Sequence, residues 1–138
     1  MAKECTSTAL RNAVACGFSN RVSTATANAL DALRFPQAHG LSGTYQLITL
    51  TPPYEEVSYP ELLEAVCNTP LIAPNTFMVI EYPVEMNCLE PVLGGDKLFG
   101  LRNRRYGRTI LAIYVYKPTR IFDLRPEEFV PYVKKNAS

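Results

Sequence analysis

The chain has 138 residues, which is the length of one domain. Apolar residues make up 47% and charged residues 20%, so a disordered or fibrous protein is excluded. The net charge is +1, and the longest apolar run, Ile110 to Tyr116, is far too short for a membrane span. The four cysteines form no C-x-x-C pair and there is one histidine, which argues against a zinc site and a disulfide framework.

Charge is strongly segregated along the chain. Between Arg34 and Lys97 there is no lysine or arginine, and this stretch holds eight acids. From Lys97 to Arg120 the chain has seven basic residues and no acid. A local basic cluster with aromatic neighbours suits a nucleic-acid backbone. The alternative is that basic strand residues protect a sheet edge from unwanted pairing.

The first third of the chain predicts helices around a short strand. Apolar spacing predicts a helix from residue 3 to about 16, closed by Gly17 and Phe18. Val22–Ala25 is predicted as a short strand. Asn28 has the position of a helix N-cap, with Asp31 three residues later, and predicts another short helix.

The middle third predicts a strand–helix–strand unit. Tyr45–Leu50 is the clearest candidate for a buried strand, and two prolines then take the chain out of the sheet. Ser58 and Glu61 have capping-box spacing and predict a helix to about Cys67. The next predicted strand is Thr76–Glu81, which Pro83 stops.

The last third predicts a loop, a hairpin and a tail. Residues 84–96 read as loop, and Leu98–Tyr106 and Thr109–Lys117 flank Gly107-Arg108, which suits a two-residue hairpin turn. A short helix near 126–135 is an option that Pro131 weakens. Alternation of strands and helices in the middle predicts a parallel α/β sheet, and the hairpin adds an antiparallel edge.

The segment Thr51-Pro52-Pro53-Tyr54 carries the clearest chemistry. In open α/β sheets, ligands bind beyond the carboxyl ends of the strands, and this segment directly follows a predicted strand. Proline has no N–H, so the loop offers carbonyl groups and the Thr51 hydroxyl as acceptors for an exocyclic amine. Tyr54 can stack on a planar base. The segment predicts a site for a flipped-out base; the alternative is a proline-rich loop with a packed tyrosine.

Several segments resemble the RsmD-type 16S ribosomal RNA guanine-N2 methyltransferases. The segment "YQLITLTPPY" resembles the fourth strand and the motif of amino-methyltransferases that ends in Pro-Pro and an aromatic residue. The similarity runs from about residue 3 to 117. The other similar segments are "NRVSTATANALDAL", "YPELLEAV", "LIAPNTFMVIEYP" and "LRNRRYGRTILAIYVYK", the last with a distinctive Arg-Arg-Tyr-Gly-x-Thr core.

This resemblance implies a Rossmann-like sheet of the kind that binds S-adenosylmethionine, here without its first two strands. It divides the chain into a partial methyltransferase domain, residues 1–117, and a tail, residues 118–138. The glycine-rich loop that holds the cofactor in the family is not recognisable, and Thr51 stands where the family usually has Asp. Asn28 and Ala29 would lie beside the cofactor's adenine, although Asn28 could instead only cap its helix.

The implied function is S-adenosylmethionine-dependent methyl transfer to the exocyclic amine of guanine in ribosomal RNA, by this chain or by a longer form of it. Thr51, Pro52, Pro53 and Tyr54 would act on the base, no metal would be needed, and Arg104, Arg105 and Arg108 would contact RNA phosphates. One alternative is an inactive RNA-binding or interaction module, and another is an unrelated α/β interaction domain.

The remaining expectations concern location and association. Cysteine usage fits a reducing, intracellular compartment, and no secretory signal or membrane association is expected. The Ser-, Thr- and Ala-rich first third loosely resembles an organelle transit peptide, although strands and helix caps explain it better. Without the first two strands, Tyr45–Leu50 would pair with Val22–Ala25 or present a bare apolar edge that favours self-association.

Overall fold

The computed structural model describes residues 3–53, 58–86 and 88–131. The chain begins with helix α1, Lys3–Ala15, as the sequence predicts. The amide of Phe18 donates to the carbonyl of Ala13 (2.8 Å), and Gly17 has φ +75°. This is the αL helix ending that only glycine adopts at little cost. A 3₁₀ turn at Ser19–Arg21 follows.

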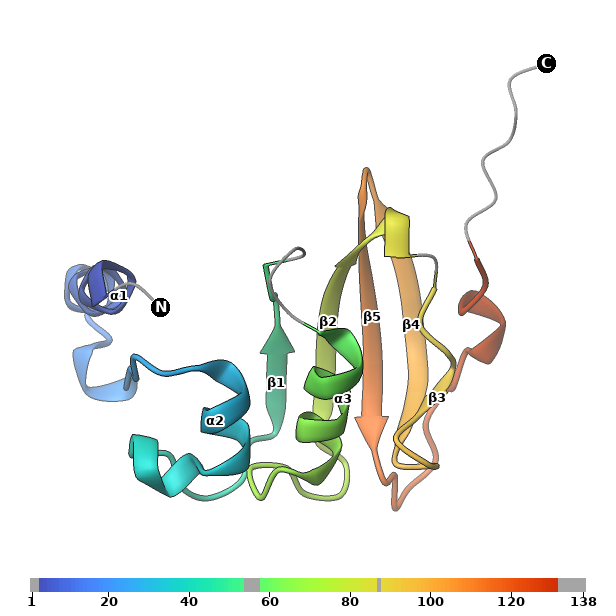
Figure 1. The fold of residues 1–138 in the computed structure, drawn as a ribbon, viewed down its shortest axis with the longest axis horizontal. Coiled ribbons are helices and arrows are strands. Elements are labelled where there is room, and N and C mark those ends of the chain that lie inside the picture. The colour runs from blue at the N-terminus through green and yellow to red at the C-terminus, as the bar shows by residue number, and fades with distance from the viewer. Residues whose placement is uncertain (1–2, 54–57, 87, 132–138) are drawn as a thin grey trace.

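Five strands form one mixed sheet in the order β1-β2-β5-β4-β3 (Figure 1). β1 and β2 run parallel, and every other neighbouring pair is antiparallel. This confirms the predicted fold class, an α/β sheet with a C-terminal antiparallel hairpin. The strands are β1 Leu47–Leu50, β2 Phe77–Pro83, β3 Val92–Leu93, β4 Leu98–Tyr106 and β5 Thr109–Tyr116.

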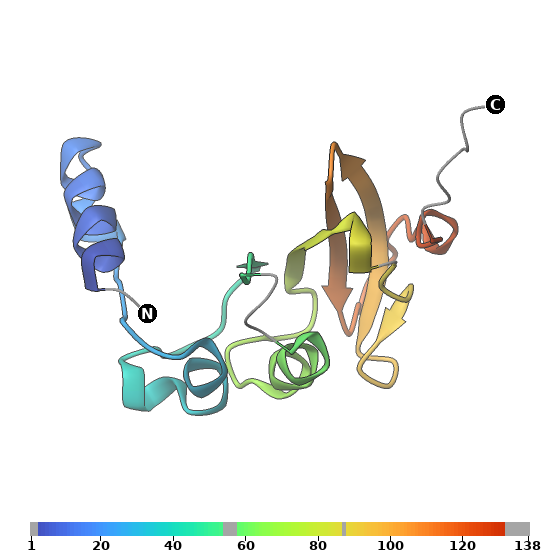
Figure 2. The ribbon, with the colours of Figure 1, turned by 45° about the horizontal axis from the view of Figure 1, so that its top comes forward.

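α2, Ala29–Arg34, and α3, Tyr59–Asn68, lie side by side along one side of the sheet, whereas α1 stands apart from it (Figures 1 and 2). α3 connects β1 to β2, and a 3₁₀-helix at Pro36–His39 follows α2. None of the helices in the described ranges has both the length and the apolarity needed to cross a bilayer.

The core lies between this helical layer and the inner face of β2 and β5. Alternation along β2 puts Met78, Ile80 and Tyr82 on the buried face, all fully inaccessible to solvent. Leu62 and Val66 of α3 belong to the same apolar cluster. The periods of 2 and 3.6 residues that predict these elements are therefore the ones that build the core.

The prediction that Tyr45–Leu50 is a buried strand is wrong about its burial. β1 lies at the edge of the sheet, Leu47 is 57% exposed, and Ile48 and Leu50 are only partly buried. An apolar strand is buried only when strands flank it on both sides and both faces are covered, and within the described part of the chain β1 has a single strand neighbour.

Val22–Ala25 is not a strand, so that prediction is also wrong. The segment is extended, and residues 22–27 make no backbone–backbone hydrogen bond with any other described residue. A strand needs a partner ladder, and β-forming residues alone do not supply one. Of the two predicted alternatives for β1, the structure therefore has the bare edge.

Three smaller predictions also need correction. Ser58 precedes α3 but makes no side-chain capping bond. The predicted loop 84–96 contains a 3₁₀ turn, Val84–Met86, and the short strand β3. The optional helix near 126–135 is a 3₁₀ turn, Pro126–Glu128, within the described residues.

The tail after β5 packs against the sheet. The Phe129 ring contacts Tyr114, with ring centres 5.2 Å apart, and lies so close to Gly100 that a Cβ there would overlap it. Phe122 meets Phe77 edge to face at 5.7 Å. Phe129 therefore belongs to the core of the sheet, and Phe122 packs on β2.

Candidate active site

Thr51, Pro52 and Pro53 directly follow β1, at the carboxyl end of the parallel β1–β2 pair. Leu50 pairs with Ile80, and β2 continues to Pro83 beyond the end of β1. Thr51 and Pro53 are exposed, and Pro52 is half-buried. Tyr54 lies outside the described residues. The segment is thus at the end of the sheet where the sequence predicts a ligand.

The start of α3 is fixed at this same end of the sheet. The hydroxyl of Tyr59 donates to the backbone carbonyl of Glu81 (3.0 Å), and Tyr59 is buried. This bond holds the first turn of α3 against β2 just past the end of β1. The end of β1 and the start of α3 therefore lie at the same end of the sheet.

Asn28 caps α2, as its sequence position predicts. Its side-chain Oδ1 accepts hydrogen bonds from the amides of Leu30 (2.9 Å) and Asp31 (3.4 Å). Asn28 and Ala29 are both exposed. Their contact with an adenine stays a prediction, and the cap already uses the oxygen that would serve it.

The described residues do not offer a complete cradle for S-adenosylmethionine. A glycine-rich cradle needs glycines in a turn that leads from a strand into a helix. None of the glycines with positive φ in the described ranges has this place, since each lies after a helix, before β1, or in a turn between β3 and β4 or between β4 and β5. These glycines are Gly17, Gly40, Gly43, Gly94, Gly95 and Gly107.

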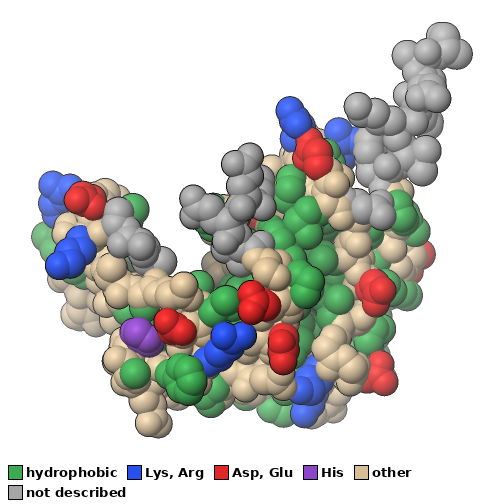
Figure 3. Space-filling view, in the orientation of Figure 1, with side chains coloured by type: hydrophobic (Ala, Val, Ile, Leu, Met, Phe, Trp, Pro, Cys, Tyr) green, Lys and Arg blue, Asp and Glu red, His purple; other side chains and the backbone are tan. Residues whose placement is uncertain are grey.

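The turn between β4 and β5 carries the predicted RNA-binding arginines. Gly107 has φ +62° and, with Arg108, forms the two-residue turn that the sequence predicts. The amide of Val84 donates to the carbonyl of Arg108 (3.0 Å), which joins this turn to the end of β2. Figure 3 shows basic side chains gathered over the turn, next to an acidic one. Thr51–Pro53 and this turn therefore lie at the same end of the sheet.

Acidic residues accompany two of these arginines. Arg108 pairs with Glu85, and this hydrogen bond raises the pKa of the guanidinium. Arg104 is 3.9 Å from Glu128, while Arg105 Nε donates to the carbonyl of Gly107. Arg108 remains 84% and Arg104 58% exposed, so both can exchange these acids for a phosphate group.

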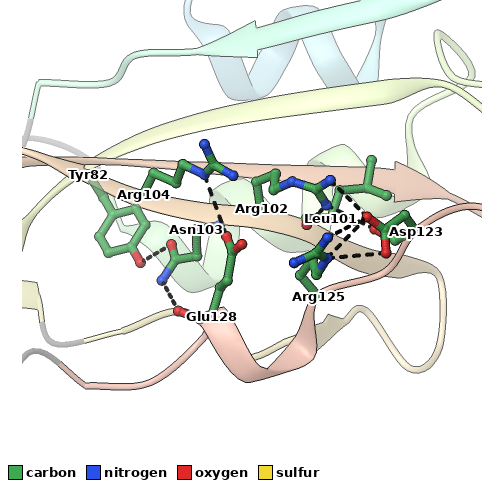
Figure 4. A network of polar contacts seen from close by, with 8 residues as sticks. All are labelled: Tyr82, Leu101, Arg102, Asn103, Arg104, Asp123, Arg125 and Glu128. Atoms are coloured by element: carbon green, nitrogen blue, oxygen red, sulfur yellow. Dashed lines mark hydrogen bonds and ion pairs between the residues drawn. The ribbon is translucent and has the colours of Figure 1, made fainter.

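A polar network that the sequence analysis missed ties the tail to β4 (Figure 4). Asn103 is its centre: its backbone N–H donates to Glu128 Oε2 (3.0 Å), its side-chain Nδ2 donates to the Glu128 carbonyl (3.2 Å), and its side-chain Oδ1 accepts from the Tyr82 hydroxyl (2.8 Å). Burial is the main reason that the pKa of Tyr82 rises to about 12. Arg102 pairs with Asp123 (3.1 Å). The available signal was the group of tail acids directly after a basic stretch.

Fold and site together define a class. A parallel β1–β2 pair with a proline-rich motif at its carboxyl end, followed by an antiparallel hairpin, is the arrangement of the methyltransferase-type sheet that the sequence resemblance implies. A family model described as "Conserved hypothetical protein 95" matches residues 1–115. The chain belongs to this family, which confirms the resemblance to the RsmD-type proteins. The interpretation as an unrelated domain is therefore wrong.

Solved structures share the fold. A conserved hypothetical protein of Streptococcus pyogenes has a TM-score of 0.70 at 20% identity, over 83% of this chain and 67% of its own. A proposed methyltransferase of Escherichia coli, yhhF, has a TM-score of 0.68 at 14% identity, over 85% of this chain and 60% of its own. A proposed methylase of Haemophilus influenzae has a TM-score of 0.63 at 17% identity, over 83% of this chain and 68% of its own. No curated protein matches the chain.

These similarities reach part of each relative only. The chain spans 60% to 68% of the lengths of the three solved structures. At such low identity the likeness establishes the fold. Family membership and this shared fold together support a methyltransferase.

Proposed function

We propose that this chain forms the base-binding side of an S-adenosylmethionine-dependent methyltransferase that acts on the exocyclic N2 amine of guanine in ribosomal RNA. The observation that carries the proposal is the position of Thr51-Pro52-Pro53 at the carboxyl end of β1, in a chain of this family. S-adenosylmethionine would supply the methyl group.

The residues after β1 suit an amine that must be turned toward an electrophile. The Thr51 hydroxyl and the carbonyls beside the two prolines accept hydrogen bonds, and no proline N–H competes for them. Accepting both N–H hydrogens of an exocyclic amine fixes its orientation and adds electron density to the nitrogen. Most of the benefit would be positional, because a correctly held amine needs no further acid or base before it attacks.

The turn between β4 and β5 suits the phosphate backbone of the same RNA. Arg104 and Arg105 end β4, and Arg108 lies in the turn, all at the end of the sheet where Thr51 lies. Arginine binds phosphate through paired N–H groups. A base-modifying enzyme needs contacts to phosphate that position the RNA, and acceptors that hold the amine of one base.

Methyl transfer tests the proposal. The chain is incubated with S-adenosylmethionine labelled in its methyl group and an RNA that carries one guanosine, and a matched RNA carries inosine, which lacks only the N2 amine. Because the described residues do not form a complete cradle for S-adenosylmethionine, we expect slow transfer, with all label in N2-methylguanosine, none in the inosine RNA, and less label with Thr51→Val. Label on a ribose or another base would contradict the N2 assignment. RNA binding without transfer would favour the alternative, an inactive RNA-binding module.

The role of the turn is tested by salt dependence. Replacing Arg104 and Arg105 by glutamine should lower the slope of log affinity against log salt by about 1.4, since each phosphate contact on a single strand contributes about 0.7. Replacing Arg11 and Arg21, exposed arginines of the N-terminal helices, removes the same charge and serves as the control. Equal slopes for the two double variants would show that these arginines only protect a sheet edge.

A further inference from the structure

The outer edge of β1 carries backbone groups that pair with no strand in the described ranges. The amide of Phe77 donates to the carbonyl of Gln46 (2.9 Å), so the backbone of residue 46 faces β2. Backbone direction alternates along a strand, so residues 48 and 50 also face β2, while Leu47 and Thr49 face outward. β1 is the last strand of the sheet on this side.

Side chains of this edge strand are uncharged, and two of its exposed ones are large and apolar. Leu47 is 57% and Tyr45 41% exposed. From Leu41 to Pro53 the chain has no charged residue at all. Protected sheet edges usually carry lysine, an inward charge or a bulge, and β1 has no charged residue to repel another strand.

An open groove lies beside this edge. It has a volume of about 800 Å³ and is lined by residues 44–47 of the edge, by residues 73–77 and Val79, by Ile113 of β5, and by one charged residue, Arg120. α1 stands apart from the sheet, beyond the outer edge of β1 (Figures 1 and 2), and none of its residues lines the groove. Apolar surface of this kind marks an interaction site.

We propose that β1 pairs antiparallel with β1 of a second copy of this chain, about a two-fold axis at Ile48. In this register Leu47 lies opposite Thr49 of the second copy, and Ile48 lies opposite its counterpart. Leu47 and Thr49 both face outward, so each of these pairs exchanges two backbone hydrogen bonds. This proposal does not depend on the proposed function.

The second copy is the favoured occupant because the edge is complementary to itself. A two-fold contact brings each surface against its own copy, so any charge on the edge would meet a like charge. The segment from Leu41 to Pro53 has no charged residue, so no like charges meet in the contact. In the proposed register Leu47 pairs with Thr49 of the second copy, and Ile48 pairs with Ile48. Such β-branched and apolar cross-strand pairs stabilise antiparallel ladders.

Sedimentation equilibrium over a range of concentrations tests the proposal. We expect the average mass to rise from that of one chain toward that of two. Thr49→Lys, at an exposed position on the outward side, should weaken association at least about tenfold. The control is Thr8→Lys, which makes the same change on the exposed surface of α1 and should associate like the parent.

Hydrogen exchange separates this pairing from unspecific association. The amides of Leu47 and Thr49 should exchange more slowly at high than at low protein concentration, while those of Ile48 and Leu50, which face β2, should not change. The proposal would be overturned if the parent chain stays monomeric, or if the Thr49→Lys variant associates as strongly as the parent. Slowed exchange elsewhere without a change at Leu47 and Thr49 would assign the contact to another surface and overturn it as well.

Discussion

The two sides of the sheet are closed in different ways. On the β4 side, β3 covers the first residues of β4, and the tail covers the following ones: the amide of Arg125 donates to the carbonyl of Gly100 (3.1 Å). On the β1 side, the outer backbone groups of Leu47 and Thr49 have no strand partner among the described residues. One chain therefore protects one edge of its sheet and exposes the other.

The two edges also differ in the chemistry of their side chains. The β4 edge has Arg102 and Arg104 facing tail acids, and it has the buried Phe129 ring. The β1 strand has no charged residue, none of its described residues makes a ring contact, and its apolar side chains remain accessible. The tail therefore covers and stabilises the β4 edge, whereas the β1 edge is available for an additional strand.

The largest expected effect is the loss of the tail's aromatic anchor. Phe129→Ala removes a buried ring from the contact with Tyr114 and Gly100, so the free energy of unfolding should fall by about 3–5 kcal/mol. Denaturant unfolding measures it. Val130→Ala, at a neighbouring 61% exposed side chain, should change it by less than about 0.5 kcal/mol. Equal effects of the two variants would show that the tail does not close this edge.

Gly100→Ala should destabilise the same contact from the opposite side. A Cβ at position 100 would overlap the Phe129 ring, and such overpacking costs about 1–3 kcal/mol. In the Phe129→Ala background the ring is gone, so the added methyl group should cost much less. A double-mutant cycle by thermal or denaturant unfolding measures this coupling. Additive effects would mean that ring and glycine do not share the site.

Alkaline pH should weaken the closed edge through Tyr82. Its pKa rises from 10.0 to about 12, chiefly because the hydroxyl is buried, so the folded state holds the proton more tightly than the unfolded state. The resulting stability is complete below pH 10 and is lost as the pH rises toward 12. Tyr82→Phe should therefore show a smaller loss over this range, while Tyr106→Phe, at a 60% exposed ring, should follow the parent. Identical profiles for parent and Tyr82→Phe would contradict this.

The smallest expected effect concerns the ion pairs of Asp123. Its hydrogen bonds to Arg125 (2.8 Å) and to Arg102 (3.1 Å) lower the pKa of the carboxyl below 3.8. The pairs stabilise the folded state above this pH and stop doing so as the pH falls through the lowered pKa. Asp123→Asn should be slightly less stable than the parent at neutral pH and low salt, and the difference should vanish in acid or high salt. A difference that is unchanged by high salt would have another origin.

Elements with clear periodicity were predictable from the sequence. α1, α3, β2 and the β4–β5 hairpin follow from apolar spacing and from Gly17 and Gly107, because these signals are local. The environment of β1 was not predictable. An apolar strand indicates burial only if its neighbours exist, and the sequence of Tyr45–Leu50 carries no information about a missing partner.

The site was predictable in part. The place of Thr51–Pro53 after a strand follows from the prolines, and the turn arginines follow from the hairpin. The acids that meet Arg104 and Arg108 were not visible, because Glu128 and Glu85 come from segments without periodicity. The place of Phe129 against Gly100 depends on a bulge between Gly100 and Arg102, which no local pattern indicates.

The affinity difference between guanosine and inosine RNA tests the central claim most directly, since the two differ only in the N2 amine. If Thr51 and the adjoining carbonyls hold this amine, the guanosine RNA should bind at least about 2–10 times more tightly, since each hydrogen bond to the amine contributes about this factor. Thr51→Val should reduce this difference and leave the salt dependence unchanged, whereas Thr8→Val, far from the site on α1, should leave both unchanged. Equal affinity of the parent chain for the two RNAs would contradict a base-amine site at the end of β1.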